Sequence, residues 1–263
     1  MTGDAFAETV APDAMSRPNV TPSVAPCPVV ILCGGQGTRI ADVSQAVPKP
    51  LLPIGEMPIL WHIMKLYSCQ GFKDFILCLG HLGDRIEEFF RCDASCRERE
   101  QDWTITFAHT GELTPTGGRL KAIEDLVQAE TFMLTYGDGL SDVDLRCLLK
   151  VHETQSRIAT VTAIRARSPF GMLEIEDGIA TSFVEKPLLD KRSNGGFFVF
   201  HRRVFDYLSL DDALEEGPFL KLVEDGELAV YEHDGFWSCM DTKKDFEALN
   251  QIWDSGRAPW RPW

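Results

Sequence analysis

The stretch PVVILCGGQGTRI, residues 28–40, joins a continuous apolar run to a glycine-rich turn. The run 29–32 predicts a strand covered on both faces, because it lacks the polar alternation of a half-exposed strand. The turn at 34–39 then offers backbone N–H groups at the start of a helix, which suits phosphate groups. The same glycines also suit a tight turn that needs positive φ angles and binds nothing. Their spacing matches neither a P-loop nor the dinucleotide-binding fingerprint.

Apolar strand patterns alternate with helical patterns after this turn. Such alternation predicts an α/β fold with a mixed, mostly parallel, Rossmann-like sheet that is flanked by helices. Ligands of such sheets lie beyond the carboxyl ends of the strands, where the glycine turn also lies. The expected strands are 29–32, 74–79, 104–108, 131–136 and 159–165, and the expected helices are 59–70, 85–90, 118–129 and 145–153.

The pattern changes from Gly171 onward, where short strands follow one another. They predict a small antiparallel extension packed on the main sheet, with no linker before it. We therefore expect one domain over 28–263, after a flexible tail at 1–27 that is rich in Ala, Pro, Ser and Thr. The expected elements of the extension are strands at 172–176, 179–184, 197–200 and 228–232 and a helix at 242–255.

Composition narrows the possible partners and location. The 263 residues carry a formal net charge of -14, which disfavours a nucleic-acid partner because that needs clustered Lys and Arg. No window approaches the roughly 18 uninterrupted apolar residues of a membrane span, so we expect no membrane partner. The eight cysteines form no CxxC pair. Several lie in apolar runs and suggest reduced core thiols and a cytoplasmic protein rather than a zinc site.

A lysine held between two prolines follows the glycine turn in Pro48-Lys49-Pro50. Proline fixes its own φ angle and restricts the residue before it, so this segment is stiff and extended. Such restraint would fix the Lys49 ammonium over a site at the sheet edge. An ordinary surface lysine would not need it.

Several ordered blocks of the sequence resemble the sugar-1-phosphate nucleotidyltransferases. The resemblance covers about residues 28–263, and within that family it is most similar to the glucose-1-phosphate cytidylyltransferases. The blocks are GGQGTR at 34–39, PKPLLPIGEMPILWHI at 48–63, TPTGGRLK at 114–121, TYGDGLSDVD at 135–144, FGMLEI at 170–175, FVEKP at 183–187, NGGFFVF at 194–200 and GFWSCMDT at 235–242.

The resemblance implies the nucleotide-diphospho-sugar transferase fold and an ordered, Mg2+-assisted direct displacement. A nucleoside triphosphate and a sugar 1-phosphate would be the partners, with CTP and α-D-glucose 1-phosphate giving a CDP-sugar and pyrophosphate. It also implies a homo-oligomer. Two alternatives remain. The chain could catalyse the same reaction with another sugar 1-phosphate or with UTP, dTTP or GTP as the donor, or it could be a non-catalytic regulatory protein that binds a nucleotide sugar.

The resemblance also implies roles for individual residues. Thr116 could contact the pyrimidine edge or only cap a helix, and Asp138 could be a metal ligand or a turn residue. The implied catalytic residues are Arg39, Lys49 and Asp138, and the implied metal ligands are Asp138 and Asp241. The nucleotide-binding set is Leu32, Gly34, Gly35, Gly37, Thr38, Arg39, Lys49, Thr116, Gly117, Gly118 and Arg119, and the sugar-phosphate set is Gly139, Gly171, Glu185, Lys186, Asn194 and Gly195.

Overall fold

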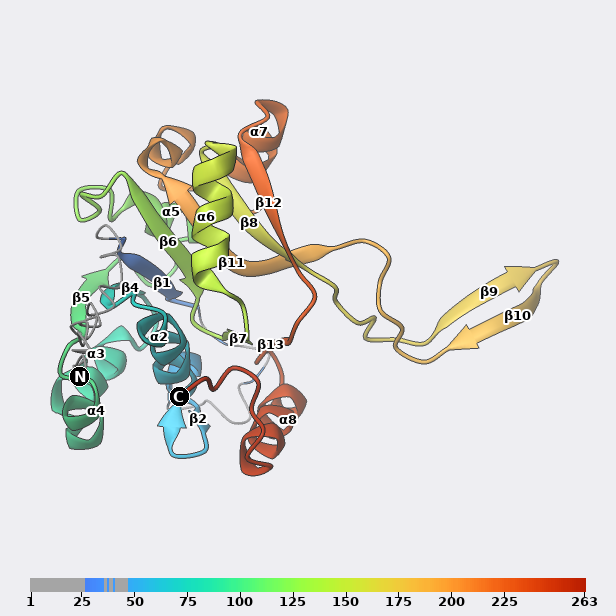
Figure 1. Cartoon of the computed structure of the whole chain (residues 1–263), viewed down its shortest axis with the longest axis horizontal. Coiled ribbons are helices and arrows are strands. Elements are labelled where there is room, and N and C mark those ends of the chain that lie inside the picture. The colour runs from blue at the N-terminus through green and yellow to red at the C-terminus, as the bar shows by residue number, and fades with distance from the viewer. Residues whose placement is uncertain (1–26, 36, 38–39, 41–46) are drawn as a thin grey trace, which may run out of the picture.

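A seven-stranded sheet forms the centre of the computed structural model, which describes residues 27–35, 37, 40 and 47–263 (Figure 1). The strand order is β12-β8-β11-β6-β1-β4-β5. Strand β11 is antiparallel to both of its neighbours, while the other neighbouring pairs are parallel. The strands are β1 (Val29–Cys33), β4 (Asp74–Leu79), β5 (Thr104–His109), β6 (Thr131–Tyr136), β8 (Ala159–Ile164), β11 (Ser193–His201) and β12 (Leu228–His233).

Strand β1 is buried on both faces, as its unbroken apolar run predicts. Its side chains alternate between two hydrophobic clusters: Val29 and Ile31 face one, and Val30 and Leu32 face the other. Each face of the sheet is therefore a separate core. The glycine turn leaves the strand where both cores end, at the carboxyl edge of the sheet.

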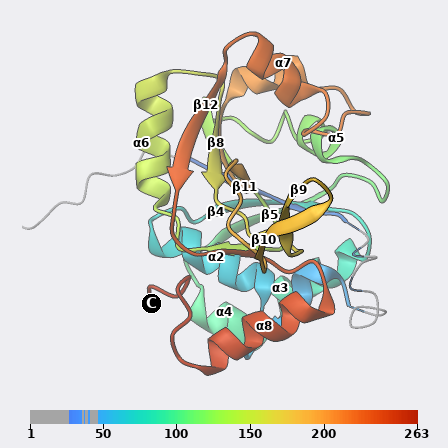
Figure 2. The ribbon, with the colours of Figure 1, turned by 90° about the vertical axis from the view of Figure 1, so that its right-hand side faces the viewer.

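Helices cover the two faces of the sheet (Figure 2). The first core receives side chains from α2 (Ile59–Cys69), α3 (Gly83–Cys92), α4 (Ala94–Arg99), α6 (Leu145–Gln155) and α8 (Lys243–Asp254). The second receives them from α5 (Thr116–Lys121), the 3-10 helix η3 (Arg202–Tyr207) and α7 (Pro218–Glu224). Helix α5 ends well before the predicted boundary at residue 129. The backbone there closes into three-residue turns, with Ile123 N donating to Leu120 O and Glu124 N to Lys121 O.

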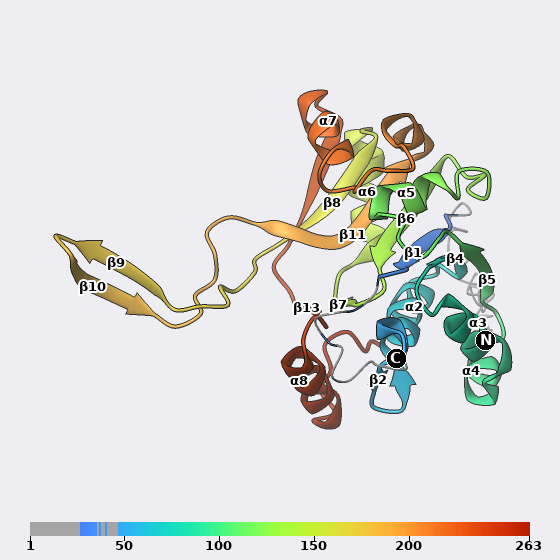
Figure 3. The same ribbon diagram turned by 180° about the vertical axis from the view of Figure 1, so that it is seen from behind.

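The predicted antiparallel extension is only partly right. The strands expected near 197–200 and 228–232 belong to the main sheet as β11 and β12. The remaining hairpin, β9 (Met172–Glu176) and β10 (Ile179–Val184), projects away from the sheet as an arm and does not pack on it (Figures 1 and 3). Its apolar side chains face outward instead: Ile175 is 64% exposed and Ile179 70%.

Two short antiparallel pairs complete the arrangement. Strand β2 (Pro53–Ile54) pairs with β3 (Met57–Pro58), after the 3-10 helix η2 (Lys49–Leu51). Strand β7 (Gly139–Ser141) pairs with β13 (Trp237–Cys239), and Met240 N donates to Asp138 O at 2.9 Å. This second pair joins the residues around 138 to those around 241. In the described part of the chain, no helix is long and apolar enough to cross a membrane.

Candidate active site

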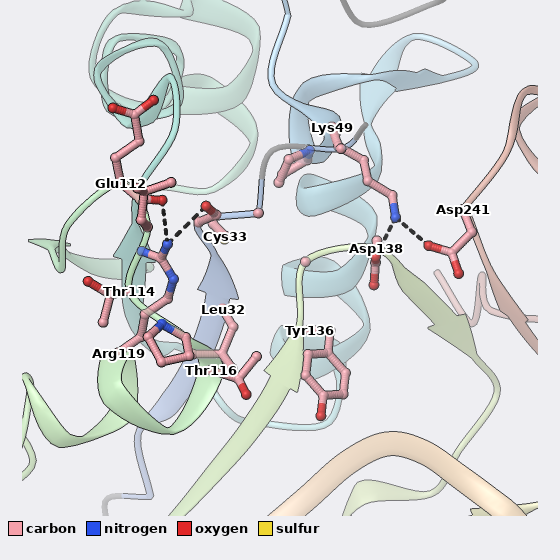
Figure 4. A pocket seen from close by; sticks show the side chains of 17 residues that line it. Leu32, Cys33, Lys49, Glu112, Thr114, Thr116, Arg119, Tyr136, Asp138 and Asp241 are labelled. Carbon is pink, nitrogen blue, oxygen red and sulfur yellow. Dashed lines mark hydrogen bonds and ion pairs between the residues drawn. The ribbon is translucent and has the colours of Figure 1, made fainter. Parts of the chain in front are cut away.

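A pocket of about 500 Å3 opens at the carboxyl ends of β1 and β6 (Figure 4). This is the sheet edge at which the sequence predicts the ligand. Backbone of the glycine turn lines it on one side, and the loop before α5 lines it on another. The lining includes Leu32, Gly34, Gly35, Gly37, Lys49, Thr116, Arg119, Tyr136, Asp138 and Asp241.

Lys49 reaches into this pocket and lies between two carboxylates. Its Nζ donates to Asp138 Oδ2 at 2.6 Å and to Asp241 Oδ1 at 2.7 Å. Lys49 begins the 3-10 turn η2 directly after Pro48, so the prediction of an extended segment at Lys49 is wrong, although both flanking prolines still restrain the turn. Burial lowers the pKa of Lys49, but the charge of Asp138 and the hydrogen bonds to both carboxylates outweigh burial and raise it. Lys49 is therefore a fixed ammonium ion.

Asp138 and Asp241 meet because β7 pairs with β13. Single donor atoms of Asp138, Asp241 and Cys239 all lie within 4.8 Å of one another. The two carboxylates already converge on one cation, the Lys49 ammonium, and carboxylate oxygens are the ligands that Mg2+ prefers. Burial and the neighbouring carboxylates raise the pKa of the Cys239 thiol, which makes it a poor partner for Mg2+. The aspartate pair fits Mg2+.

Arg119 is buried and holds two walls of the pocket together. Its guanidinium donates to Gly34 O at 3.0 Å and to Glu112 O at 3.1 Å (Figure 4). It also donates to Gly111 O at 2.7 Å. A Cβ on Gly34 would lie 2.0 Å from Arg119 Cζ, so this glycine is needed for the close approach of the guanidinium. Arg119 also lines the pocket, so its predicted place in the nucleotide-binding set stays a prediction.

The paired glycines at the start of α5 allow close packing of a neighbouring loop, and their predicted nucleotide-binding role stays a prediction. A Cβ on Gly118 would lie 2.0 Å from Leu210 O, so the loop 209–217 can sit against α5 only because a glycine is there. Gly117 and Gly118 are not among the described residues that line the pocket. Thr116 does line it, and the helix N-cap is Pro115 instead.

A smaller pocket of about 230 Å3 shares Tyr136, Asp138 and Asp241 with the first. It receives Gly139, Asn194 and Gly195, which belong to the predicted sugar-phosphate set. The Asn194 side chain accepts from Gly196 N at 2.8 Å, and Trp237 Nε1 donates to Gly195 O at 2.7 Å. The two pockets therefore meet at the aspartate pair.

Three other predicted sugar-phosphate residues lie at the base of the β9–β10 arm. Gly171, Glu185 and Lys186 are not among the described residues that line either pocket. The Lys186 ammonium lies 3.5 Å from a Glu185 carboxylate oxygen, and both side chains are exposed. A single copy of the chain does not bring these residues together with Lys49 and Asp138.

Some predicted residues lie outside the described part of the chain: Thr38, Arg39 and the tail up to residue 26. Conversely, sequence reasoning missed Tyr136 and Glu215. Tyr136 directly precedes the Gly137-Asp138 turn and lines both pockets, so its place beside Asp138 was the available signal. Glu215 contacts Thr116 from 99 residues away, and the sequence carries no pattern that joins them.

Comparison with known proteins agrees with this geometry. The nucleotidyl transferase family matches residues 28–253. The chain is 45% identical over 251 residues to a probable glucose-1-phosphate cytidylyltransferase of Bacillus subtilis, covering 89% of this chain and 99% of that protein. It is 41% identical over 253 residues to the glucose-1-phosphate cytidylyltransferase of Salmonella typhi, covering 89% and 98%.

Solved structures show the same fold. A putative glucose-1-phosphate thymidylyltransferase from Bacillus anthracis superimposes with a TM-score of 0.67 at 21% identity, covering 86% of this chain and 94% of that one. A likeness at this identity concerns the fold alone. The family match over residues 28–253 and the two relatives at 41–45% identity show that this protein is an enzyme of the nucleotidyl transferase family.

Proposed function

We propose that the chain transfers a cytidylyl group from CTP to α-D-glucose 1-phosphate, giving CDP-glucose and pyrophosphate with the help of Mg2+. The two cytidylyltransferase relatives support this pair of substrates. The observation that carries the chemistry is Lys49 between Asp138 and Asp241, at the junction of two pockets. Two anionic substrates repel each other, and this junction gathers the charges that would hold them together.

In the proposed reaction, a phosphate oxygen of the sugar 1-phosphate attacks the α-phosphorus of CTP. A new P–O bond forms as the bond to the bridging oxygen of the β-phosphate breaks, and pyrophosphate leaves. Asp138 and Asp241 would hold Mg2+, which supplies positive charge to the phosphate oxygens. The Lys49 ammonium would neutralise charge that develops in the transition state. Arg39, outside the described residues, would bind the leaving β- and γ-phosphates.

The two pockets would hold one substrate each. The larger pocket, with the glycine turn at Gly34, Gly35 and Gly37, would take the nucleotide. The smaller one, with Gly139, Asn194 and Gly195, would take the hexose phosphate. Because the pockets share Asp138, the two phosphate groups would meet beside the metal, which aligns the attack without a covalent enzyme intermediate.

A homo-oligomer would complete the sugar-phosphate side. Glu185 and Lys186 lie on the arm, away from their own pockets, and the arm exposes Ile175 and Ile179. Exposed apolar side chains gathered on one element are typical of an interface. We infer that the arm docks on a second copy of this chain, and that Gly171, Glu185 and Lys186 act near the sugar phosphate in that assembly.

We also propose that residues 28–263 act as one domain in a reducing cytoplasm. The cysteines of the described chain are free thiols, and Cys33, Cys78 and Cys96 are buried, as expected of reduced core residues. Cys69, Cys92 and Cys147 are exposed.

The proposed function is tested by incubating the protein with each of CTP, UTP, dTTP and GTP against several sugar 1-phosphates in Mg2+. Pyrophosphate release is the readout. We expect release with CTP and glucose 1-phosphate and little with the other pairs. Activity with another pair would keep the chemistry and change the substrates. Nucleotide-sugar binding without release from any pair would support a regulatory protein instead.

A further inference from the structure

We propose that Glu215 is a positioning residue that makes the nucleotide pocket select a pyrimidine with an exocyclic amino group. The inference rests on the proposed function, since it assumes that a nucleotide base occupies the larger pocket. Glu215 is an exposed residue of the loop 209–217 that is not among the described pocket-lining residues, and it acts through the hydroxyl groups of Thr116 and Tyr136.

The Glu215 carboxylate binds both hydroxyl groups. One of its oxygens accepts from Thr116 Oγ1 at 2.7 Å, and the other accepts from the Tyr136 hydroxyl. An ionised carboxylate only accepts hydrogen bonds, so both hydroxyl protons must point toward Glu215. The backbone N–H of Leu214 also donates to Thr116 Oγ1, at 2.8 Å. The Thr116 hydroxyl thus has one lone pair left and no proton to give.

This arrangement decides what Thr116 can offer to a ligand. Thr116 lines the pocket, and with its proton held by Glu215 its hydroxyl is solely an acceptor there. Cytosine presents an N–H2 donor at C4, whereas uracil and thymine present a carbonyl acceptor at the same place. An acceptor in the wall therefore favours cytosine and opposes uracil and thymine. Without Glu215 the hydroxyl could rotate and donate, and this preference would weaken.

The base of a bound nucleotide would lie at the Thr116 end of the pocket, because its phosphates would lie at the opposite end, beside Lys49 and the aspartate pair. Lys49, Asp138 and Asp241 gather at one side of the view in Figure 4, and Thr116 lies away from them beside Arg119. The uncharged side chains of Leu113 and Thr114 also line the pocket near Thr116. A nucleotide whose phosphates lie at the aspartate pair would direct its base toward Thr116, on the wall where the Arg119 guanidinium already donates to backbone carbonyls.

The fold keeps Glu215 in place through close packing of its loop. Gly118 N donates to Asp212 O at 3.0 Å, and a Cβ on Gly118 would lie 2.0 Å from Leu210 O. The glycine at the start of α5 thereby lets the loop approach until Glu215 meets Thr116. This gives Gly118 a role in base selection although it lies behind the pocket wall.

The test compares Glu215→Ala and Thr116→Val with Glu216→Ala, a matched control at an exposed neighbouring glutamate. Binding of CTP and of UTP is measured by calorimetry without sugar phosphate, and kcat/KM is measured for both nucleotides. In both variants we expect the preference for CTP over UTP, as a ratio of affinities and of kcat/KM values, to fall about ten-fold or more. This is the size of one lost base contact. The same ratio should stay unchanged in Glu216→Ala. Thermal melting checks that each variant folds.

Three outcomes would overturn the inference, and they separate its failure from a failure of the proposed function. A wild-type preference for CTP that survives in Glu215→Ala, or an equal loss of CTP and UTP binding, would remove Glu215 from base selection and leave the proposed function standing. A wild-type preference for a nucleotide without the amino group would overturn the proposed donor and this inference together.

Discussion

Lys49 and Asp138 form an ion pair of 2.6 Å across 89 residues of chain, and the same ammonium lies 2.7 Å from Asp241. The protein therefore carries its own cation between the two carboxylates that fit Mg2+. A metal ion held by these same carboxylate oxygens would compete with the ammonium for them, and we expect it to displace Lys49. Lys49 would then be free to bind substrate phosphate.

Replacing Lys49 by Met should have opposite effects on metal binding and on turnover. Without the competing ammonium, Mn2+ should bind the nucleotide-free protein about ten-fold more tightly, as judged by electron paramagnetic resonance. Pyrophosphate release should fall by about three orders of magnitude, because the transition state loses a fixed positive charge. Lys73→Met, in an exposed ion pair with Asp102, is the control. Unchanged Mn2+ affinity in Lys49→Met would contradict the displacement.

Replacing Asp138 by Asn should remove a metal ligand and keep the shape of the turn. We expect Mn2+ binding to weaken and turnover to fall by about two to four orders of magnitude, with the thermal melting temperature nearly unchanged. Chelation by EDTA should abolish turnover of the wild-type protein, and added Mg2+ should restore it. Full pyrophosphate release by Asp138→Asn would refute the assignment.

Replacing Arg119 by Lys should loosen the pocket and destabilise the fold. The guanidinium donates to five acceptors. The compact ammonium group of lysine has three donors and lacks the planar fork of the guanidinium, so it cannot reach all five acceptors. We expect a loss of about 2–4 kcal/mol in the free energy of unfolding by urea, because buried carbonyls lose their donors. CTP should also bind more weakly. Arg91→Lys, at an exposed site, is the control, and equal stability of the two variants would argue against the clamp.

Placing a charge on the arm should dissociate the proposed oligomer. Ile175→Glu introduces a carboxylate on an exposed apolar hairpin, where it would be buried in the interface without a partner. Light scattering should report a smaller particle than for the wild type, and the KM for the sugar phosphate should rise. Leu220→Glu, on the equally exposed α7, should change neither quantity. A monomeric wild-type protein with full activity would exclude the shared site.

Stability should fall in mild acid because of two buried histidines. Burial lowers the pKa of His62 and of His152 from 6.5 to about 4, so between these pH values the unfolded chain binds more protons. Folding stability is therefore full above pH 6.5 and falls as the pH drops toward 4. At pH 5 each histidine costs about 2 kcal/mol. His152→Gln should reduce the difference in unfolding free energy between pH 7 and pH 5, measured in urea, and an unchanged difference would argue against this assignment.

The sequence predicted those helices and strands whose boundaries depend on a local pattern of apolar and polar residues. The boundaries of β4 and β6 agree with the prediction, because each is an apolar run ended by polar residues or glycine. The direction of β11 was not predictable, since an apolar run reads alike in parallel and antiparallel strands. Helix α4 (Ala94–Arg99) was missed because its residues are mostly polar and show no apolar period.

The candidate site also contains some features that the sequence predicts and others that it does not. The restraint on Lys49 was visible in the adjoining prolines, and the family resemblance pointed to Asp138 and Asp241. The hydrogen bonds of Arg119 and the contact of Glu215 with Thr116 join distant segments, and only the folded chain brings these together. Contacts between distant residues produce no local periodicity or bias in composition, so they cannot be predicted from this sequence alone.

The place of β11 in the sheet also bears on how the chain is synthesised. Strands β1, β4, β5 and β6 are complete once residue 136 has been made, and they can form a parallel unit on their own. Strand β8 can join this unit only through β11, which ends at His201. A nascent or truncated chain that stops before residue 193 therefore leaves the edge of β6 unpaired, and such an edge invites aggregation until β11 emerges from the ribosome.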